Sequence, residues 1–520
     1  MPKRPRPVRI SLCLIARDEQ AVIGQCLASA KPFVDEIIVV DTGSTDDTVA
    51  IARRAGAKVF FHSWDGDFAA ARNVALLNAT GDWIFSLDAD EVLDPSSGPR
   101  IRELIALPST KPRVYSILVR NRMDNEETEQ IFTSHGQRIF PRHPRIRWTR
   151  RIHEQVTHLD GDDNLEFVFS DLVAIAHSGY LKETWPGKSK TNRNFELLEG
   201  MIAADPEDIF SIYCLGQERY TAKQFPASIG YFERAIAMGK LKLPIPSFLA
   251  YAYALGTGAC VELKQYDRGI ALGEEGVRAF EYPDLFCNLA ACYYLWGHHE
   301  RAIPLLERAL ALHGRVSALG GDAGSTTWRP LQLLGDICSA RGNHAKAIEY
   351  YEQAIAIDSD RPMPTVLAAF AYIAVGKLDV GASYLDRVLQ KYPGHDLANL
   401  GKVDWFVAVG QPANAQIYAR DLFSRYPASV GFRVRLTDLL WASGRLPEAA
   451  QILRVGIEGG TAHPALFQRQ GIVLSRLLQW SEAGPAFDRA IALDPTDLRS
   501  RFGRETARIL GEGWGAKTGN

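Results

Sequence analysis

Apolar and polar residues follow two alternating patterns along the first ninety residues of this chain. Four short apolar runs are separated by longer stretches in which apolar residues recur at helical spacing. Short buried runs that alternate with helices of this length predict a parallel sheet built from right-handed β-α-β units. The predicted strands cover 8–16, 35–41, 57–64 and 82–88, and the predicted helices cover 19–30, 45–55 and 68–79.

Acidic residues stand where two of these predicted strands end. Asp88 and Asp90 follow the apolar run 83–87 as an Asp-x-Asp pair, and Asp41 opens the turn "DTGSTDDT" after the second strand. Open α/β sheets bind ligands at the carboxyl ends of their strands. Proteins hold Mg²⁺ or Mn²⁺ with one or two carboxylates plus the phosphate oxygens of a substrate. The pattern therefore indicates either a site for a nucleotide diphosphate or a solvated acidic loop.

Several arginines are candidates for contacting such a diphosphate. Arg72 lies in the third predicted helix and can pair with a phosphate, with a site carboxylate or in a structural salt bridge. The segment 142–154, "RHPRIRWTRRIHE", is strongly basic, but the formal net charge of the chain is −2 and no groove-entering motif accompanies the arginines. This combination argues against nucleic acid binding. A departing diphosphate needs cations near the developing charge, and Arg138 and Arg151 are the candidates for that role.

Five ordered motifs resemble a known family. The segments "SLCLIARDE", "DEIIVVDTGSTDDT", "DFAAARN", "ATGDWIFSLDADE" and "RIHEQV" look like the family 2 glycosyltransferases of GT-A fold, in a bacterial branch that often carries tetratricopeptide repeats. The resemblance covers about residues 8–200. It implies an α/β GT-A domain with a Rossmann-like, mostly parallel sheet. It also implies transfer of a sugar from a nucleotide-diphosphate donor, usually with inversion at the anomeric carbon, with Mn²⁺ or Mg²⁺ as the metal.

The same resemblance implies roles for individual acids and histidines. Asp41 resembles the acid that reads the nucleobase, Asp88 the acid near the ribose, and Asp90 the metal ligand. His177 in "AIAHSGY" is similar in position to a second protein ligand of the metal. His153 competes with it for that role, and Asp88 is a further candidate ligand. The implied nucleotide site comprises Ala16, Glu19, Asp41, Arg72, Asp88, Arg138 and Arg151.

An inverting transfer also needs one base to take the proton of the acceptor while the acceptor attacks. A carboxylate within hydrogen-bond reach is sufficient for this. Glu154 in "RIHEQV" resembles the acidic residue that ends a short element and supplies the base in GT-A enzymes. We therefore expect Glu154 to be the catalytic residue.

The chain changes character after residue 205, where segments of the form "AI..YE.A" recur. Most of their starting points lie about 34 residues apart, which is the tetratricopeptide period. Two longer offsets coincide with insertions at 239–247 and 313–330. The segments begin at Ala227, Arg268, Arg301, Lys346, Val380, Ala413, Glu448 and Glu482. A glycine precedes the second helix in five repeats, where a small residue is expected to let the two helices approach closely: Gly297, Gly342, Gly376, Gly410 and Gly444.

About eight such helix pairs predict a superhelix with a concave face. Faces of this kind capture peptides or protein partners, mediate dimerisation, or brace a neighbouring domain, and the sequence leaves these three roles open. The insertion 313–330 is rich in glycine, which is typical of a mobile loop. Whether this loop gates the catalytic crevice is also left open.

Composition adds three expectations. The seven cysteines are scattered without a paired framework, which suits a reducing cytoplasm. There is no run of 18 apolar residues, so we expect no transmembrane segment. The start, "MPKRPRPVR", is basic and rich in proline, which predicts a disordered tail over 1–7. The expected location is the cytoplasm, with peripheral attachment to the inner membrane face left open.

These observations predict a GT-A glycosyltransferase domain over 8–204, of which the helix 188–204 is a connector, followed by a tetratricopeptide domain over 205–515. The expected activity is an inverting, metal-dependent hexosyltransferase that uses a nucleotide sugar, most simply a UDP-sugar, and a peptide, protein or glycan acceptor. Two alternatives remain. One is a protein-interaction scaffold whose nucleotide-binding domain is catalytically degenerate. The other is a transferase acting on the lipopolysaccharide core or another surface glycan.

Overall fold

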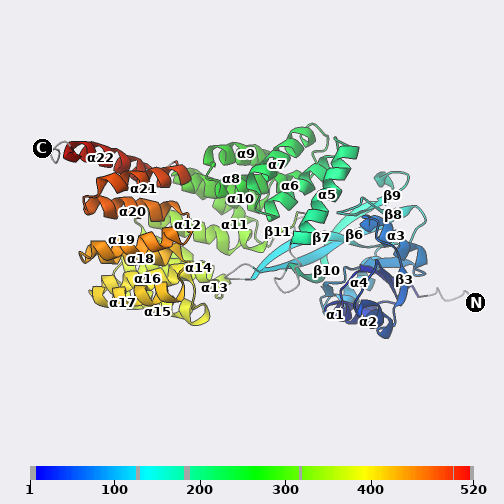
Figure 1. The fold of residues 1–520 in the computed structure, drawn as a ribbon. Helices are drawn as coiled ribbons and strands as arrows, with labels where there is room; N and C mark the ends of the chain where they lie inside the picture. The colour runs from blue at the N-terminus through cyan, green and yellow to red at the C-terminus, as the bar shows by residue number, and fades with distance from the viewer. Residues whose placement is uncertain (1–6, 125–128, 181–187, 315–318, 496, 516–520) are drawn as a thin grey trace, which may run out of the picture. The chain divides into compact units, whose positions relative to one another are not determined.

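The computed structural model describes residues 7–124, 129–180, 188–314, 319–495 and 497–515 (Figure 1), so most of the predicted disordered tail lies outside the described residues. The chain forms two compact units, Met1–Leu334 and Gly335–Asn520, which divide within one helix. The predicted boundary at 204/205 marks a change in sequence composition. The boundary between the compact units falls after Leu334, so the first helical repeats belong to the same unit as the sheet.

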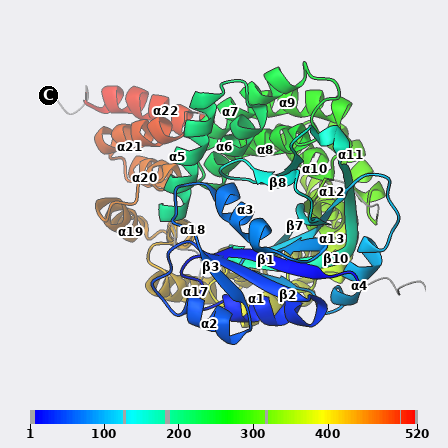
Figure 2. The same cartoon turned by 90° about the vertical axis from the view of Figure 1, so that its right-hand side faces the viewer.

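The four predicted strands form the parallel part of one sheet in the order β3-β2-β1-β4, with a helix in each connection (Figure 2). The fold class predicted from the sequence is thus confirmed. The strands are β1 Ile10–Ala16, β2 Glu36–Asp41, β3 Lys58–Phe61 and β4 Trp83–Ser86, and the helices are α1 Ile23–Ala30, α2 Thr48–Arg54 and α3 Phe68–Asn78.

Four further strands extend the sheet beyond β4, in the order β7-β6-β10-β5. The strand β7 runs antiparallel to both β4 and β6, whereas β6 and β10 are parallel. A separate hairpin, β8-β9, packs beside α3. These elements are β5 Glu91–Leu93, α4 Gly98–Ile105, β6 Arg113–Asp124, β7 Glu129–Pro141, β8 Ile146–Thr149, β9 Gln155–His158 and β10 Glu166–Tyr180, with short 3-10 turns η1 Lys31–Phe33 and η2 Asp162–Asn164.

The central strands are buried on both faces, which explains their continuous apolar sequences. Along β1, Leu12 and Leu14 point into a core shared with α1, α2 and α4. The intervening residue Cys13 points to the opposite core, which α3 and the β8-β9 hairpin cover. Figure 2 shows α1 and α2 on one side of these strands and α3 on the other. This double cover leaves the carboxyl ends of the strands as the edge where polar side chains can gather.

Apart from one short strand and one 3-10 turn, helices make up the rest of the described chain (Figure 1). The connector α5 Lys188–Ala204 is followed by eight helix pairs and a final helix. The pairs are α6 Ile209–Thr221 with α7 Phe225–Gly239, α8 Leu249–Glu262 with α9 Tyr266–Ala279, α10 Pro283–Leu295 with α11 His299–Ala311, α12 Trp328–Ala340 with α13 His344–Ile357, α14 Pro362–Ala374 with α15 Leu378–Lys391, α16 Asp396–Ala408 with α17 Pro412–Arg425, α18 Val430–Ala442 with α19 Leu446–Glu458, and α20 Pro464–Arg476 with α21 Trp480–Leu493; α22 Leu498–Gly515 ends the array. Each predicted repeat start lies one or two residues inside the second helix of a pair.

The glycine that precedes the second helix has a different role from the one predicted. Space around these five glycines is open, since a Cβ added at any of them would meet no heavy atom within 4 Å. All five instead have positive φ, between 76° and 84°. The equivalent position in the other three pairs also has positive φ, although it holds Lys223, Lys264 or Leu478. The position therefore requires a left-handed backbone, which glycine adopts without steric cost, and the prediction of close helix approach there was wrong.

Close approach occurs at another glycine, inside the first helix of several pairs. A Cβ added at Gly216 would lie 2.8 Å from the Phe232 ring, and one at Gly471 would lie 2.7 Å from the Phe487 ring. These glycines let an aromatic residue of the second helix pack against the backbone of the first. The repeat thus uses glycine twice, once for conformation and once for space.

The insertion 313–330 folds in part onto the sheet. Within it, β11 Gly321–Asp322 pairs antiparallel with Phe132 and Thr133 of β7, and the 3-10 turn η3 Ala323–Thr326 leads into α12. Residues 315–318 lie outside the described residues. The described part of the insertion is therefore an ordered strand and turn rather than the mobile loop that its glycine content suggested.

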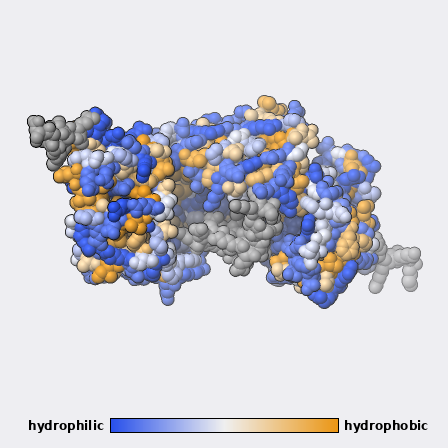
Figure 3. Space-filling view, in the orientation of Figure 1, coloured by the Kyte–Doolittle hydropathy of each residue, from blue (hydrophilic) through white to orange (hydrophobic). Residues whose placement is uncertain are grey.

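Three further properties complete the description. Hydrophobic and hydrophilic side chains are interspersed on the face shown in Figure 3. Within the described ranges, no helix combines the length and the apolar composition that a membrane span would need. The seven cysteines are free thiols, and six of them are buried.

The left-handed position of the last helix pair gives a test of the repeat design. We predict that Leu478→Gly leaves the free energy of unfolding unchanged or raises it slightly. Relief of the left-handed strain, about 1–2 kcal/mol, offsets the loss of about 0.5–1 kcal/mol that glycine causes elsewhere. Denaturant unfolding measures this. The control is Ser481→Gly in the first turn of α21, where the backbone is helical and glycine should lower stability. A loss at position 478 as large as at 481 would contradict the assignment.

Candidate active site

The carboxyl end of β2 presents Asp41 at the edge of the sheet. Its Oδ2 atom accepts hydrogen bonds of 3.0 Å from the backbone N–H groups of Gly43 and Ser44, because Gly43, with φ 109°, turns the chain back over the carboxylate. The second oxygen, Oδ1, is buried and has no hydrogen-bond partner among the described residues. A buried acceptor without a donor is costly, so this atom is suited to receiving a hydrogen bond from a ligand.

The end of β1 lies beside Asp41. Ala16 is in register with Asp41 in the parallel pairing, and its carbonyl accepts a hydrogen bond of 2.9 Å from the Thr42 N–H. The backbone N–H of Glu19 donates to Thr48 Oγ1 at 2.8 Å, which ties the start of the β1-α1 connection to α2. The predicted nucleotide-site residues Ala16, Glu19 and Asp41 therefore come from neighbouring strand ends.

Arg72 is the centre of the polar network at the end of β4. Its side chain is 8% exposed, and it donates from Nη2 to Asp88 Oδ1 at 2.5 Å and from Nε to Glu154 Oε1 at 2.7 Å. The guanidinium also lies over the ring of Trp148, with Cζ 5.1 Å from the ring centroid. One arginine of α3 thus joins an acid after β4 to an acid that precedes β9.

A second arginine reaches the same acids from β7. Arg138 Nη2 donates to Asp88 Oδ2 at 3.0 Å and to Glu91 Oε1 at 2.6 Å. Burial raises the pKa of Asp88, but the guanidinium charges of Arg72 and Arg138 lower it by more, so its pKa lies well below the ordinary value. Asp88 keeps 33% of its side chain exposed and can meet a ligand, whereas Glu91 is 2% exposed and cannot.

Asp90 lies next to His177 of β10. Asp90 Oδ2 and His177 Nε2 are 3.3 Å apart, and His177 Nδ1 is 2.8 Å from Asn121 Oδ1 of β6. Burial lowers the pKa of His177, but the hydrogen bond to Asp90 and the charges of Asp90, Glu91 and Asp88 raise it by more, so its pKa lies above the ordinary value. The surrounding acids therefore favour a positive charge at this position.

Two residues of the basic segment lie apart from this network. Arg151 donates to the backbone carbonyls of Gly66 and Asp65, at 3.1 and 3.2 Å, and so fastens the loop before α3. His153 Nε2 lies 3.7 Å from Glu218 Oε1 of α6. The structure thus brings together Asp88, Asp90, His177, Glu154, Arg72 and Arg138, with Asp41, Ala16 and Glu19 at the adjoining strand ends, and leaves Arg151 and His153 outside the ion-pair network.

Sequence reasoning missed three residues of the site. Glu91 follows the Asp-x-Asp pair directly, and its Oε2 accepts the Asp88 N–H at 2.8 Å, which fixes the turn that carries both acids. Asn121 orients His177, and Trp148 covers Arg72. The only signal for Glu91 was its place as a third acid in "DADE"; Asn121 and Trp148 come from strands whose pairing the sequence did not reveal.

The arrangement combines the parts needed to bind and polarise a diphosphate ester. Two buried guanidinium groups can stabilise negative charge, and Asp90 with His177 offers an oxygen and a nitrogen ligand side by side. Within the described residues, no three His, Cys, Asp or Glu side chains form a metal site by themselves. A cation bound here would therefore have two protein ligands, and oxygens of its substrate would complete its coordination, as is common at Mg²⁺ sites.

Comparison with known proteins agrees with this geometry. The family described as "Glycosyl transferase family 2" matches residues 11–164, which include the whole network except His177, and "Tetratricopeptide repeat" matches residues 288–360. A TPR repeat-containing protein of Synechococcus elongatus, Synpcc7942_0270, is 32% identical over 316 residues, which are 58% of this chain and 75% of that protein.

Several relatives carry the name glycosyltransferase, and two of them illustrate the match. The SPbeta prophage-derived glycosyltransferase SunS of Bacillus subtilis is 29% identical over 44% of this chain and 53% of its own length. An uncharacterized glycosyltransferase of Rickettsia felis is 42% identical over 19% of this chain and 34% of its own length. The chain thus spans about half of the first of these two relatives and a third of the second. By these matches the chain belongs to the family 2 glycosyltransferases, and it carries tetratricopeptide repeats after the transferase domain.

Proposed function

We propose that the protein is an inverting, metal-dependent glycosyltransferase that moves a hexose from a UDP-sugar to a peptide, protein or glycan acceptor. One observation carries the proposal: acids far apart in the sequence meet around the Arg72 guanidinium at the carboxyl ends of the strands. Asp88 and Glu154 both contact Arg72, at 2.5 and 2.7 Å. A catalytically degenerate domain would have no need to keep this set complete.

The nucleotide is proposed to bind along the ends of β1, β2 and β4. The free acceptor atom Asp41 Oδ1 suits an N–H group of the base, and Asp88, 33% exposed, suits the ribose. Ala16 and Glu19 adjoin Asp41 and complete this side. Arg138 lies near the expected diphosphate, and Arg151 remains a candidate for the same role from the neighbouring loop.

The residues present fit a divalent cation. Asp90 and His177 are adjacent, and the bond between His177 Nδ1 and Asn121 fixes the ring so that Nε2 faces Asp90. Mn²⁺ or Mg²⁺ bound by this pair would offset the charge of the departing diphosphate. His153 is the less suitable ligand, because its ring faces Glu218 of α6 instead. Arg72 and Arg138 supply further positive charge close by.

Glu154 is proposed to take the proton of the acceptor. Its side chain is 12% exposed, and Arg72 orients it by holding one carboxylate oxygen. The acceptor would approach from the side of the β8-β9 hairpin and attack the anomeric carbon opposite the leaving diphosphate. The repeats are proposed to dock a peptide or protein acceptor or to form a dimer. A surface-glycan acceptor would leave the same catalytic residues in place.

A panel of nucleotide sugars tests the proposal as a whole. The purified protein is incubated with each donor in the presence of Mn²⁺, and released nucleotide is measured with and without a chelator. We expect release from one donor class, with UDP-sugars first, and loss of release on metal removal. Absence of release from every donor, with candidate peptide and glycan acceptors present, would reject the transferase activity.

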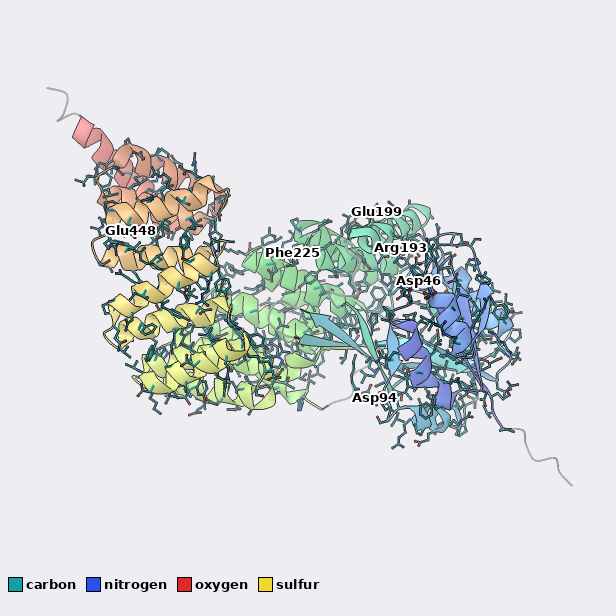
Figure 4. The ribbon with its side chains drawn as sticks, turned by 60° about the horizontal axis from the view of Figure 1, so that its bottom comes forward. Asp46, Asp94, Arg193, Glu199, Phe225 and Glu448 are labelled. Atoms are coloured by element: carbon teal, nitrogen blue, oxygen red, sulfur yellow. The ribbon has the colours of Figure 1, made fainter. Side chains whose placement is uncertain are left out.

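The proposed metal ligand can be removed singly. We expect Asp90→Ala to abolish Mn²⁺-dependent nucleotide release and to leave the fold intact, since Asp90 is not one of the two acids that pair with the buried Arg72. Thermal unfolding and steady-state rates measure the two effects. The matched control is Asp94→Asn, four residues further on; Asp94, labelled in Figure 4, pairs with Arg120 and not with the arginines of the proposed site. Full activity of Asp90→Ala would exclude the metal assignment.

The proposed base can be neutralised without a change of shape. We expect Glu154→Gln to lower kcat by about 10²–10⁴-fold, the usual contribution of general base catalysis. Affinity for UDP should stay within a few-fold, because the glutamine amide oxygen can still accept the hydrogen bond from Arg72, and Arg72 keeps its ion pair with Asp88. Steady-state turnover measures kcat, and isothermal titration calorimetry measures the affinity for UDP. A variant that loses UDP binding but keeps its kcat would assign Glu154 to the nucleotide instead.

Nucleotide and metal should stabilise the protein together. At a concentration of 100 times its dissociation constant, a ligand of the folded state adds about 2.7 kcal/mol. We therefore expect UDP with Mn²⁺ to raise the unfolding temperature clearly, and UDP alone to raise it less. Differential scanning fluorimetry measures the shift, with Asp90→Ala as the control that should lose the Mn²⁺-dependent part. Equal shifts with and without the metal would count against a shared metal site.

A further inference from the structure

The loop that carries Glu154 has a strained backbone. Residues 150–154 join β8 to β9, and two of them, Arg150 and His153, have positive φ values of 75° and 53° although neither is glycine. Such conformations cost on the order of 1–3 kcal/mol each and persist only where the surroundings hold them. The contacts that hold this loop come mainly from the helices that follow the transferase domain.

Arg150 is fastened to the start of α6, the first helix of the repeat array. Its Nη2 atom donates to Asp208 Oδ2 at 2.5 Å and to Ser211 Oγ at 2.7 Å, and its Cζ lies 4.8 Å from the centroid of the Phe210 ring. Asp208 is also the N-cap of α6, because its Oδ1 accepts the Ser211 N–H at 3.2 Å. Burial raises the pKa of Asp208, but the hydrogen bonds from Ser211 and Arg150 lower it by more, which keeps the pair charged.

The rest of the loop is held on the same side. Ile152 is 5% exposed and packs in one apolar cluster with Phe195 and Leu198 of α5 and with Ile209 of α6. His153 faces Glu218, one turn before the end of α6. Arg150 and Ile152 are therefore anchored on α5 and α6, Arg151 is anchored on the loop before α3, and His153 lies beside α6.

An additional contact fixes the loop to the start of α3. The carbonyl of Arg151 accepts the Phe68 N–H at 2.9 Å, and the Cζ atom of Arg193 of α5, a residue labelled in Figure 4, lies 4.9 Å from the centroid of the Phe68 ring. On the other side, Arg72 of the same α3 holds the Glu154 carboxylate. The loop is thus clamped between α3 and the helices α5 and α6, which leaves Glu154 little freedom.

We propose that α6 is part of the catalytic apparatus: Asp208 and Ser211 are positioning residues that, through Arg150, fix the strained loop and so place the Glu154 carboxylate. This inference rests on the proposed role of Glu154 as base. The first helix pair then serves the transfer reaction itself, in addition to any role that the later repeats have in binding partners.

The test separates kcat from nucleotide binding. We expect Asp208→Asn and Arg150→Ala to lower kcat by about 10- to 100-fold, because misplacement of a catalytic group by about 1 Å has effects of this size. The dissociation constant of UDP should be unchanged, since Arg150 and Asp208 contact each other and α6, while Arg151, the one nucleotide candidate in this loop, is held separately by Gly66 and Asp65. Asparagine retains a good N-cap for α6, so Asp208→Asn removes the charge pair without removing the helix start.

Two comparisons exclude a merely structural effect. The double variant Asp208→Asn, Arg150→Ala should lose no more rate than Arg150→Ala alone, because both changes break one interaction. Arg150→Lys, which keeps a charge for Asp208, should recover part of the rate. Asp205→Asn, at an exposed acid in the turn before α6, is the matched control and should keep wild-type kcat.

The outcomes distinguish this inference from the proposed function. Nucleotide release by the wild type, with kcat unchanged in Asp208→Asn and Arg150→Ala, would overturn the positioning role and leave the transferase intact. Losses that add in the double variant, or that appear as weaker UDP binding at constant kcat, would overturn it as well. No release by the wild type from any donor would instead reject the transferase activity, and the inference with it.

Discussion

The ion pairs of Arg72 are the interaction on which the site depends. A nearly buried guanidinium joins Asp88 after β4 to Glu154 before β9, two acids that lie 66 residues apart in the chain. Loss of one partner of such a buried group typically costs about 3–5 kcal/mol, because it leaves an uncompensated charge. The same contacts orient the proposed base relative to the proposed nucleotide site. Arg72 therefore both stabilises the fold and orients the proposed catalytic residues. Both effects require that α3 stays packed on the sheet.

Support for this residue comes from two directions. Asn73, next to Arg72, binds the Trp148 backbone through both ends of its amide, at 2.8 and 3.0 Å, and thereby docks the β8-β9 hairpin on α3. From the opposite side, α5 and α6 hold the loop between the two strands of that hairpin. The transferase domain is thus completed by helices that a reading of the repeats alone would assign to a separate binding module.

Sequence patterns identified the parts of the site that are local in the chain. The strands β1, β2 and β4 were predictable because buried parallel strands are continuous apolar runs, and the position of Asp41, Asp88 and Asp90 at the sheet edge was predictable because each ends or follows such a run. The role of Glu91 was not, since nothing in the sequence distinguishes a 2% exposed acid from a solvated one. Residues brought in by β6 and β8 depend on antiparallel pairings between distant segments. The positions of the repeat glycines were predicted correctly, but their role was not, because a positive φ and tight packing both select glycine and the sequence alone does not distinguish them.

The pairing of β11 with β7 carries a consequence for how such proteins can be recombined. A strand that follows the third helix pair of the repeat array is hydrogen-bonded into the transferase sheet, and Gly320 sits so close to the Thr133 carbonyl that a Cβ there would collide with it. Chimeras that exchange repeat arrays between relatives would cut through this shared sheet if joined near residue 204. A junction after α13 would transplant the later repeats and keep both the sheet and the fourth helix pair whole, so the transferase has to be exchanged together with its first four helix pairs.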